Sequence, residues 1–505
     1  MNCIITIELG TNAVRVFAFD LQGEVIGFQK GTYPTFHEQP DHSEQDPEQM
    51  FITMLYVLKK LLNEVVYTKK FEVSCICFSS SMHSLLAVDE DGIPLGNAIT
   101  WADNRGKIEA ATLKGTPLGD TIYKATGTPI HPMSPLVKIA WLRNNDPERF
   151  KLTHKFLSIK SYIIQQLTGS CIIDHSIASA TGLMNIHSLE WDSSALDFAG
   201  ITAARLPQLV PVFYSDMKLK REYQKSLRLL PSVRILIGSS DGCLATLGAG
   251  VWDKGRATIT IEDSGAFRVI GTEVLDDPGQ QLFNYRLTNE LLVSGGPTNN
   301  GGVILEWFAN QFGELSTEYD SEQALTGLIR EASIIPPGSN GLLFLPYLLG
   351  ERAPIWNANA RGCYFGLNIR HERKHMIRAT IEGILFEMFS IGKTLEAHRN
   401  IESLSINGSF ASIPLCTQMI ADMFNKPVNT LIHGNSIGVG AYLLSATDLG
   451  IYPNLEQASK QVRMHQTFLP DPKAHEIYKQ YFRIFENLTK KLGTDFDDLA
   501  ALPTN

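Results

Sequence analysis

A β-rich pattern that occurs twice, about half the chain apart, constrains this fold more than any other feature. The first copy is Ile5-Thr6-Ile7-Glu8, followed by the turn Gly10-Thr11-Asn12 and a second apolar run that carries an arginine. The second copy is Ile259-Thr260-Ile261-Glu262, followed by Asp263-Ser264-Gly265 and a similar run. Strand, short turn and strand is typical of a β-hairpin. The repeat predicts two similar domains, each with a turn whose backbone N–H groups suit phosphate.

The length of the chain agrees with this division. A single core rarely serves 505 residues, so we expect domains at residues 1–250 and 251–505. Helical patterns fill the gaps between the strands: Asp46-Pro47-Glu48 is typical of a helix start, and a long helix is expected at about 374–398. Strands alternating with helices predict an α/β fold with a ligand cleft between the two domains.

Charge and cysteine content exclude several classes of protein. The net charge is −9 and no basic run is present, so nucleic-acid binding is not expected. The seven scattered cysteines favour free thiols in a reducing compartment. No apolar stretch approaches the ~18 residues of a membrane-spanning helix, and no signal peptide is recognisable. We expect a cytoplasmic protein without a membrane partner; its oligomeric state stays open, with a homodimer among the alternatives.

Several motifs, in order along most of the chain, resemble the FGGY carbohydrate kinases. The resemblance implies two ribonuclease-H-like, actin-like domains, ATP and Mg²⁺ as cofactors, and a sugar or sugar acid as phosphoryl acceptor. Segments such as 126–135 and 177–182 are similar to the gluconate-phosphorylating branch, which implies conversion of D-gluconate to 6-phosphogluconate. The motifs are Ser81-Met82-His83-Ser84, Trp101-Ala102-Asp103-Asn104-Arg105, Ser239-Ser240-Asp241-Gly242, Gly350-Glu351-Arg352-Ala353-Pro354-Ile355-Trp356 and Arg378-Ala379-Thr380-Ile381-Glu382-Gly383.

Asp241 is the expected general base. It follows the apolar run Ile235-Leu236-Ile237-Gly238 and should lie at a strand end, where ligand sites of α/β proteins open. An Asp before Gly242 could equally cap the N-terminus of a helix, and the residue pattern leaves both readings open. The resemblance implies the base, which accepts the proton of the sugar hydroxyl during phosphoryl transfer.

The resemblance also implies a set of sugar-binding side chains. His83 would donate to a hydroxyl, Trp101 would form a flat apolar wall and Asp103 would accept from hydroxyls. Arg105 would pair with the carboxylate of an aldonic acid, with a surface salt bridge as its alternative. His131 is a further candidate, for which core packing is the more usual role. The expected set is Met82, His83, Trp101, Asp103, Arg105 and His131.

A second set is implied for the nucleotide. Backbone and side-chain groups of the two hairpin turns would bind phosphate, and Glu8 would be linked to Mg²⁺. An ordinary turn is the alternative for every glycine in this set. The expected nucleotide-binding residues are Thr11, Asn12, Arg15, Asp263, Ser264, Gly265, Gly302, Glu306, Gly408 and Ser409.

The nucleotide side departs from the family pattern at several positions. Glu8 stands where the family usually has Asp, and Asn12 replaces a Thr. Glu262-Asp263 stands where the second phosphate motif normally reads Gly-Thr, while Ser409 and Ile413 alter the adenosine motif. Two extra carboxylates beside a triphosphate are unfavourable unless a cation lies between them.

Three functions therefore remain open from the sequence. The first is an active ATP-dependent gluconate kinase that uses Asp241. The second is a non-catalytic sugar-acid-binding protein on a kinase fold, which the pair Glu262-Asp263 favours. The third is an active kinase for another sugar, such as xylulose.

Overall fold

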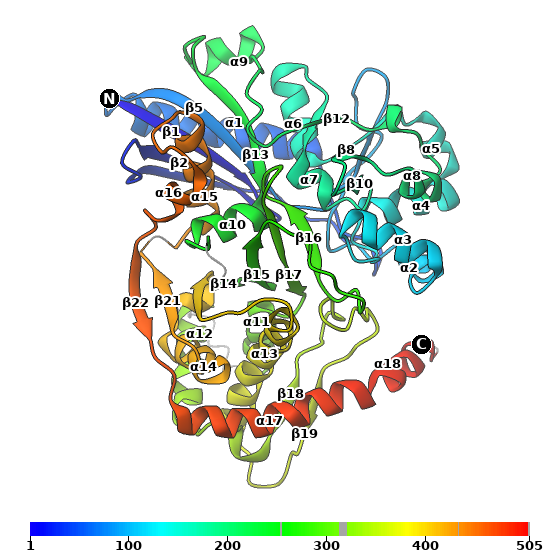
Figure 1. The fold of residues 1–505 in the computed structure, drawn as a ribbon, viewed down its shortest axis with the longest axis vertical. Coiled ribbons are helices and arrows are strands. Elements are labelled where there is room, and N and C mark those ends of the chain that lie inside the picture. Colours follow the sequence, from blue (N-terminus) through cyan, green and yellow to red (C-terminus); the bar gives the residue numbers. More distant parts are fainter. Residues whose placement is uncertain (253–254, 313–320, 433, 503–505) are drawn as a thin grey trace.

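The computed structural model describes residues 1–252, 255–312, 321–432 and 434–502, and its two halves are each built around one large β-sheet (Figure 1). The N-terminal sheet lies in the upper part of the view and the C-terminal sheet below it. Two helices, α10 (Asp241–Gly248) and α15 (Ser436–Asp448), lie where the halves meet. The expected α/β class with two domains is confirmed.

The N-terminal sheet has the strand order β13-β5-β1-β2-β3. Strands β1, β2 and β3 form an antiparallel meander, whereas β5 and β13 run parallel to β1. The strand bounds are β1 Asn2–Leu9, β2 Ala13–Asp20, β3 Val25–Thr32, β5 Glu72–Ser80 and β13 Arg234–Ser240.

The C-terminal sheet repeats this arrangement and confirms the duplication predicted from the sequence. Its strand order is β16-β17-β15-β14-β20-β21-β22. Strands β14, β15 and β17 form the antiparallel meander, and β20 and β21 run parallel to β14. Strands β16 and β22 extend the two edges. The bounds are β14 Arg256–Ile261, β15 Gly265–Gly271, β16 Phe283–Arg286, β17 Leu292–Thr298, β20 Ser403–Asn407, β21 Val428–Leu431 and β22 Met464–Phe468.

The alternation of side chains along β1 decides which way Glu8 points. Ile5 packs into the N-terminal core with α1 (Pro47–Leu61) and α6 (Ile159–Thr168). Ile4 lies in a different cluster, which it shares with α10 and α15. Since successive residues of a strand point to opposite faces, Glu8 faces the same side as Ile4 and therefore the second domain.

Both helices predicted from the sequence are present. Asp46 caps α1, because its Oδ1 accepts hydrogen bonds from the backbone N–H groups of Glu48 (2.9 Å) and Gln49 (3.1 Å). The long helix is α13 (Arg373–Glu396), which packs under the C-terminal sheet. The remaining α-helices are α2 Lys107–Leu113, α3 Pro117–Thr126, α4 Pro135–Asn145, α5 Pro147–Leu152, α7 His175–Ser179, α8 Ser193–Ala199, α9 Arg221–Ser226, α11 Gly302–Phe312, α12 Ser321–Ser333, α14 Pro414–Phe424, α16 Leu455–Ser459, α17 Pro472–Lys491 and α18 Gly493–Ala501.

A long connection between β5 and β13 carries most of the residues expected to touch a sugar. It contains helices α2 to α9, which lie beside the N-terminal sheet (Figure 1). Short strands hold these helices together: β6 Leu86–Val88, β7 Ala98–Ile99, β8 Lys155–Leu157, β9 Ile172–Asp174, β10 Met184–Asn185, β11 Glu190–Trp191 and β12 Gln208–Val210.

Helices α10 and α15 connect the two halves through an unusually close contact. A Cβ on Gly248 would lie 1.8 Å from the carbonyl oxygen of Ser436, and one on Gly440 would lie 2.0 Å from that of Leu244. The two backbones therefore touch. Helix α15 comes late in the chain, yet it packs on the N-terminal sheet, where Figure 1 shows it beside β1 and β2.

All seven cysteines are free thiols, and Cys75 and Cys77 are buried on one face of β5. Within residues 1–252, 255–312, 321–432 and 434–502, no helix is long and apolar enough to cross a bilayer.

Candidate active site

Asp241 lies at the junction between β13 and α10. Gly238 has a φ of 71°, and a Cβ there would lie 1.9 Å from the carbonyl oxygen of Phe78, so glycine is required at this irregular step of the strand. Ser240 is the N-cap of α10 and Asp241 is its first residue. The strand-end position is confirmed, and the alternative that Asp241 caps the helix is corrected, because Ser240 occupies that place.

The environment of Asp241 suits a proton acceptor. The residue is partly exposed, and its Oδ1 accepts a hydrogen bond from the backbone N–H of Gly242 (2.7 Å). Desolvation raises its pKa to about 6, in opposition to the positive charge of Arg268 and to the Gly242 hydrogen bond. A carboxylate with a pKa near the working pH is both ionised and basic enough for general-base catalysis.

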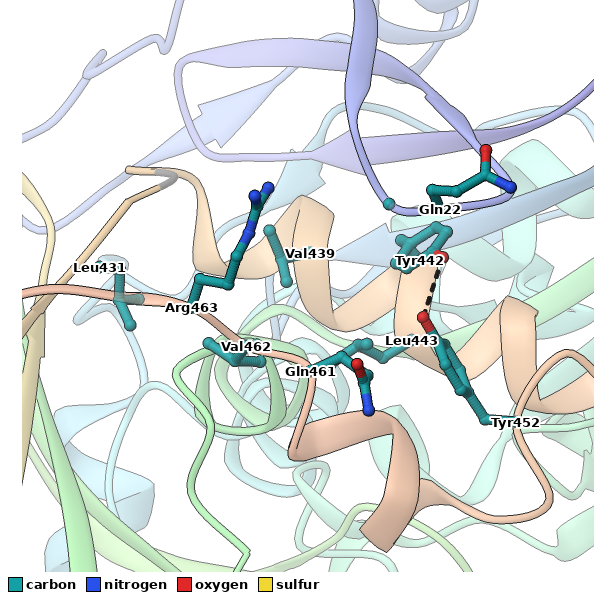
Figure 2. Close-up of a pocket in the computed structure, with 11 residues that line it drawn as sticks. Gln22, Leu431, Val439, Tyr442, Leu443, Tyr452, Gln461, Val462 and Arg463 are labelled. Atoms are coloured by element: carbon teal, nitrogen blue, oxygen red, sulfur yellow. Dashed lines mark hydrogen bonds between the residues drawn. The ribbon is translucent and has the colours of Figure 1, made fainter.

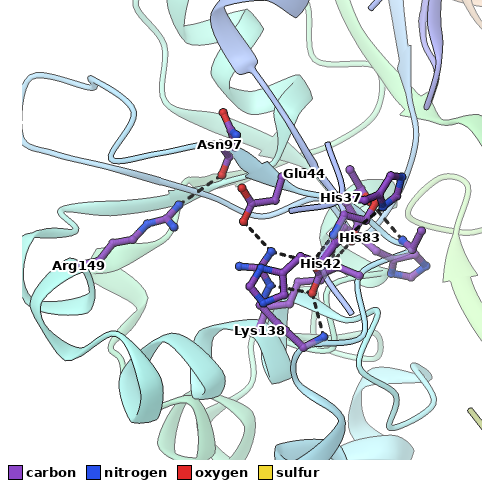
Figure 3. A network of polar contacts seen from close by, with 12 residues as sticks. His37, His42, Glu44, His83, Asn97, Lys138 and Arg149 are labelled. Carbon is purple, nitrogen blue, oxygen red and sulfur yellow. Dashed lines mark hydrogen bonds and ion pairs between the residues drawn. The ribbon is translucent and has the colours of Figure 1, made fainter. Parts of the chain in front are cut away.

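His83 occupies a position that fixes its protonation. Its φ of 66° is in the left-handed region, and its carbonyl oxygen accepts a hydrogen bond from Nζ of the buried Lys138 (2.6 Å; Figure 3). Its Nδ1 lies 2.7 Å from the carbonyl oxygen of Ala180 and must donate to it. Desolvation lowers the His83 pKa to about 3, so the ring is neutral. Its Nε2 is then an acceptor, which corrects the expectation that His83 donates to a sugar hydroxyl.

His131 has the complementary tautomer. Its Nδ1 accepts a hydrogen bond from the backbone N–H of Met133 (3.2 Å), and burial lowers its pKa well below the usual value. The neutral ring therefore carries its proton on Nε2 and can donate from it. Its ring lies edge-on to Trp356, with centroids 5.4 Å apart. Both rings line a pocket of about 850 Å³ that α2 and α18 bound, so His131 is not confined to a closed core.

The structure corrects the expected roles of Asp103 and Arg105. Arg105 donates from Nε and Nη2 to both oxygens of Asp103 (2.8 and 2.7 Å) and from Nη2 to Glu44 (2.6 Å). Asp103 has no exposed surface and also accepts from the backbone N–H of Ser43 (2.7 Å). These carboxylates already neutralise the guanidinium, and the lone pairs of Asp103 are occupied. The pair therefore braces the loop instead of binding a substrate; Figure 3 shows Glu44 in this network.

Trp101 connects the sugar side to the first phosphate turn. Its Nε1–H donates to Oγ1 of Thr11 (2.8 Å). The guanidinium carbon of Arg352 lies 4.8 Å from the centroid of its ring, which is a cation–π distance. The Trp101 ring, which was expected to face the sugar, thus has the guanidinium of Arg352 from the C-terminal domain over it.

Glu8 joins the two domains at the first phosphate turn. Its Oε1 accepts from Nη1 of Arg15 (2.6 Å), and its Oε2 accepts from Nδ2 of Asn435 (3.3 Å), the N-cap of α15. Within the described residues, no group of three or more His, Cys, Asp or Glu side chains is arranged to hold a metal ion. Mg²⁺ usually keeps several waters and takes one or two carboxylates together with substrate phosphates. The single carboxylate of Glu8 fits that kind of site.

The second phosphate turn is closed by its own hydrogen bonds. The backbone N–H of Gly302 donates to the carbonyl oxygen of Glu262 (2.6 Å), and those of Gly301 and Val303 donate to the carbonyl oxygen of Asp263 (both 3.2 Å). In this conformation, these three N–H groups are not free to bind phosphate, which corrects the expected contribution of Gly302.

Acidic side chains gather around that turn. Nδ2 of Asn12 donates to Oδ2 of Asp263 (3.3 Å), which links the two hairpin turns. Desolvation raises the pKa of Glu262, as do the charges of Asp263 and Glu8, against the charge of Arg15. The other residues expected to bind the nucleotide are Ser264 in the turn, Gly265 at the start of β15, Glu306 on α11, Gly408 and Ser409. The hydroxyl of Ser409 donates to the carbonyl oxygen of Ile261 (3.2 Å).

Sequence reasoning missed three polar groups of the C-terminal domain. Arg268 on β15 lies close enough to Asp241 to lower its pKa, and Arg352 lies over Trp101. The ring of Tyr285 lies edge-on to His83, with centroids 5.8 Å apart. The signal for Arg268 was present, because it is the arginine of the second repeat; Arg352 is part of the quoted Gly350–Trp356 motif.

A separate pocket lies away from these residues. It is lined by Gln22, Tyr442, Tyr452 and Arg463, among others, where the β2–β3 turn meets α15 (Figure 2). Its volume of about 40 Å³ is enough for a water molecule or two and too small for a sugar.

Comparison with known proteins gives matches over both halves of the chain. The FGGY family of carbohydrate kinases matches with its N-terminal domain at residues 3–248 and with its C-terminal domain at residues 259–449. The gluconokinase of Bacillus subtilis (strain 168) is 35% identical over 499 residues, which cover 98% of this chain and 97% of that protein. The xylulose kinase of the same strain is 30% identical over 500 residues, 98% of each protein.

Solved structures of two sugar kinases also match nearly the whole chain. A gluconate kinase from Lactobacillus acidophilus superposes with a TM-score of 0.92 at 31% identity, over 99% of both chains. A ligand-bound xylulose kinase from the same organism has a TM-score of 0.92 at 31% identity, over 99% of this chain and 100% of that one.

Proposed function

Because the chain belongs to the FGGY family of carbohydrate kinases, we propose that it transfers the γ-phosphoryl group of ATP to the 6-hydroxyl of D-gluconate. The observation that carries this proposal is the partly exposed Asp241, which has a pKa of about 6 at the end of β13. The higher identity to a gluconokinase than to a xylulose kinase favours gluconate as the acceptor.

The proposed reaction is an in-line displacement. The 6-hydroxyl oxygen of gluconate attacks the γ-phosphorus, and the bond from that phosphorus to the bridging oxygen of ADP breaks. Asp241 accepts the hydroxyl proton as the new O–P bond forms. His83, as an acceptor at Nε2, and His131, as a donor at Nε2, would orient other hydroxyls. ADP and 6-phosphogluconate leave, and Asp241 returns its proton to water.

On the nucleotide side, Glu8 and Arg15 are the residues that would hold Mg²⁺ near the phosphates. Bound Mg²⁺ would neutralise phosphate charge, and Glu8 is the residue we assign to it, directly or through water. Arg15, which pairs with Glu8, would hold the carboxylate in place. Free cysteines are usual in a reducing compartment, which supports the cytoplasm as the location.

A second candidate function has a specific observation in its favour. The N–H groups of Gly301, Gly302 and Val303 are engaged by the turn at Glu262 and Asp263, and both of those side chains are acidic. Such a turn leaves few backbone donors for the ATP phosphates, which favours a protein that binds the sugar acid without transferring phosphate. The affinity for ATP therefore separates the two candidate functions.

An ADP-release assay with gluconate, xylulose and glycerol tests the proposal. We expect gluconate to have the highest kcat/KM and Asp241→Asn to lower kcat by about 10²–10⁴-fold while gluconate still binds. A preference for xylulose would replace the substrate. Gluconate binding without ADP release from the unaltered protein would support the non-catalytic alternative.

A further inference from the structure

Arg268 brings a guanidinium group to the sugar side of the site. It lies beyond Gly265 on β15, about 10 Å along an extended strand from the second phosphate turn. A Cβ on Gly242 would lie 3.2 Å from Nε of Arg268 and 3.0 Å from Cε of Met82. The guanidinium therefore packs beside the first turn of α10 and the expected sugar-binding Met82, and its Nη1 donates to Oγ1 of Thr260 on β14 (3.1 Å).

Arg352 approaches the same region from a different element. Its side chain is buried, and Nη2 donates to the carbonyl oxygen of Thr298 (2.8 Å). It lies over Trp101, and its positive charge contributes to the lowered pKa values of His83 and His131. These contacts place Arg352 among the residues that resemble the family's sugar-binding set.

Three hydrogen-bond donors in this region lack a partner. They are Nε of Arg268, Nε of Arg352 and the hydroxyl of Tyr285, and each is enclosed without a hydrogen-bond acceptor among the described residues. Tyr285 lies on β16 with its ring stacked on Phe283 (centroids 4.2 Å apart) and edge-on to His83. Buried donors without acceptors are costly, so their number here indicates a missing acceptor.

Two of the three unpartnered donors belong to guanidinium groups, which favour an anionic acceptor. Among the residues that the structure describes, no carboxylate forms an ion pair with Arg268 or Arg352 within 4.0 Å. Two carboxylates lie near them: Asp241 acts on both arginines, and the buried Glu351 acts on Arg352. The oxygens of Glu351 already accept hydrogen bonds from Thr298, Asn299 and Asn300. The Nε–H groups of both arginines are therefore enclosed without a hydrogen-bond acceptor, and a buried charged donor without an acceptor is unfavourable.

We propose that Arg268 and Arg352, with the hydroxyl of Tyr285, bind the carboxylate of the sugar acid. This assignment rests on the proposed function and identifies the residues that make an aldonate the preferred substrate. The carboxylate completes the hydrogen bonds of the three donors. The hydroxyl at the far end of the substrate is thereby presented to Asp241. A neutral ketose such as xylulose supplies neither the charge nor a bidentate acceptor.

The test compares D-gluconate with D-gluconamide, which keeps every hydroxyl and replaces the carboxylate by a neutral amide. In the unaltered protein, we expect kcat/KM for gluconate to exceed that for gluconamide by about 10–100-fold, the effect of a charge-assisted hydrogen bond. Arg268→Met and Arg352→Met should each remove most of this preference, and Tyr285→Phe should remove a smaller part. The ratio of the two substrates is measured on the same protein, so partial misfolding of a variant does not change it.

Arg105→Met and Arg370→Met are the matched controls. Arg105 is enclosed by Asp103 and Glu44, and Arg370 is exposed on the surface, so both variants should keep the preference for gluconate. Equal losses on both substrates after Arg268→Met and Arg352→Met would overturn the proposal and indicate that these cations act on the phosphoryl group.

A calorimetric measurement of gluconate binding distinguishes failure of this inference from failure of the proposed function. If the unaltered protein binds gluconate without phosphorylating it, and the arginine variants lose that binding while the controls keep it, the proposed reaction fails and the carboxylate site stands. If the unaltered protein binds gluconate and gluconamide equally, the carboxylate site is wrong, whatever the turnover.

Discussion

The ionised carboxylate of Asp241 is expected to lower the stability of the folded protein, although catalysis needs it. Its pKa of about 6 lies above the ordinary value of 3.8, so the folded protein binds this proton more tightly than the unfolded chain does. The stabilisation is complete below about pH 4 and is lost as pH rises through 6. Asp241→Asn should therefore raise the free energy of unfolding at pH 7.5 by on the order of 1–3 kcal/mol, while turnover falls. Thermal unfolding at pH 4 and 7.5 checks this, since the gain should vanish at the lower pH.

The same pKa predicts the acid limb of the rate profile. The base works only when ionised, so kcat/KM for gluconate should fall about tenfold per unit below pH 6. A profile that stays flat to pH 5 would contradict the assignment of Asp241 as the base.

Glu262 and Asp263 are expected to weaken ATP binding. A carboxylate about 5 Å from a phosphate charge costs about 3 kcal/mol at an effective dielectric constant near 20. Glu262→Gly combined with Asp263→Thr should raise ATP affinity at fixed Mg²⁺, as measured by calorimetry, and the exposed Glu148→Gln is the control. Weaker binding with reduced dependence on Mg²⁺ would show instead that the pair holds a metal ion.

At the residue scale, local context predicted where some site residues lie, and the family resemblance supplied their roles. The apolar run before Asp241 predicted its place at a strand end, whereas the family resemblance implied its role as the base. The link of Glu8 to Mg²⁺ was likewise implied by the resemblance. Arg105 was misassigned, since its partner Glu44 comes from a distant segment that only the folded chain brings close. Arg268 and Arg352 were missed as site residues for the same reason. Only the folded structure shows that their Nε atoms lack a hydrogen-bond partner.

At the element scale, the contact between α10 and α15 should be the most sensitive to added volume. In Gly440→Ala the new methyl group would lie 2.0 Å from the carbonyl oxygen of Leu244 and must displace backbone. We expect a loss of about 1–3 kcal/mol in unfolding free energy. Turnover should also fall, since α10 begins at Asp241. Gly327→Ala, at an open position of α12, should instead be neutral or stabilise by up to about 1 kcal/mol.

Local signals were sufficient to predict the elements, but not all of their neighbours. The hairpins, α1 and α13 were predicted from period, capping residues and turns, which act within a few residues. The packing of α15 on the N-terminal sheet depends on Gly440 meeting Leu244 far away in the chain. No local pattern specifies that contact, and the domain boundary at residue 250 remains a prediction.

At the scale of the whole molecule, the duplication accounts for the site. Each half supplies a β-hairpin turn, and Asn12 of the first reaches Asp263 of the second. The N-terminal half provides Asp241 and the neutral His83, whereas the C-terminal half provides Arg268 and Arg352. In the proposed complex, a sugar acid is held between a base from one half and cations from the other, so neither half is expected to act alone.

The most direct measurement is a crystal structure of the full chain with D-gluconate and a non-hydrolysable ATP analogue. The account predicts that the 6-hydroxyl lies within about 2.6–3.2 Å of the Asp241 carboxylate, in line with the γ-phosphorus. The carboxylate of gluconate should contact Arg268 and Arg352. Gluconate bound in the reverse orientation, or with its carboxylate on Arg105, would contradict the account.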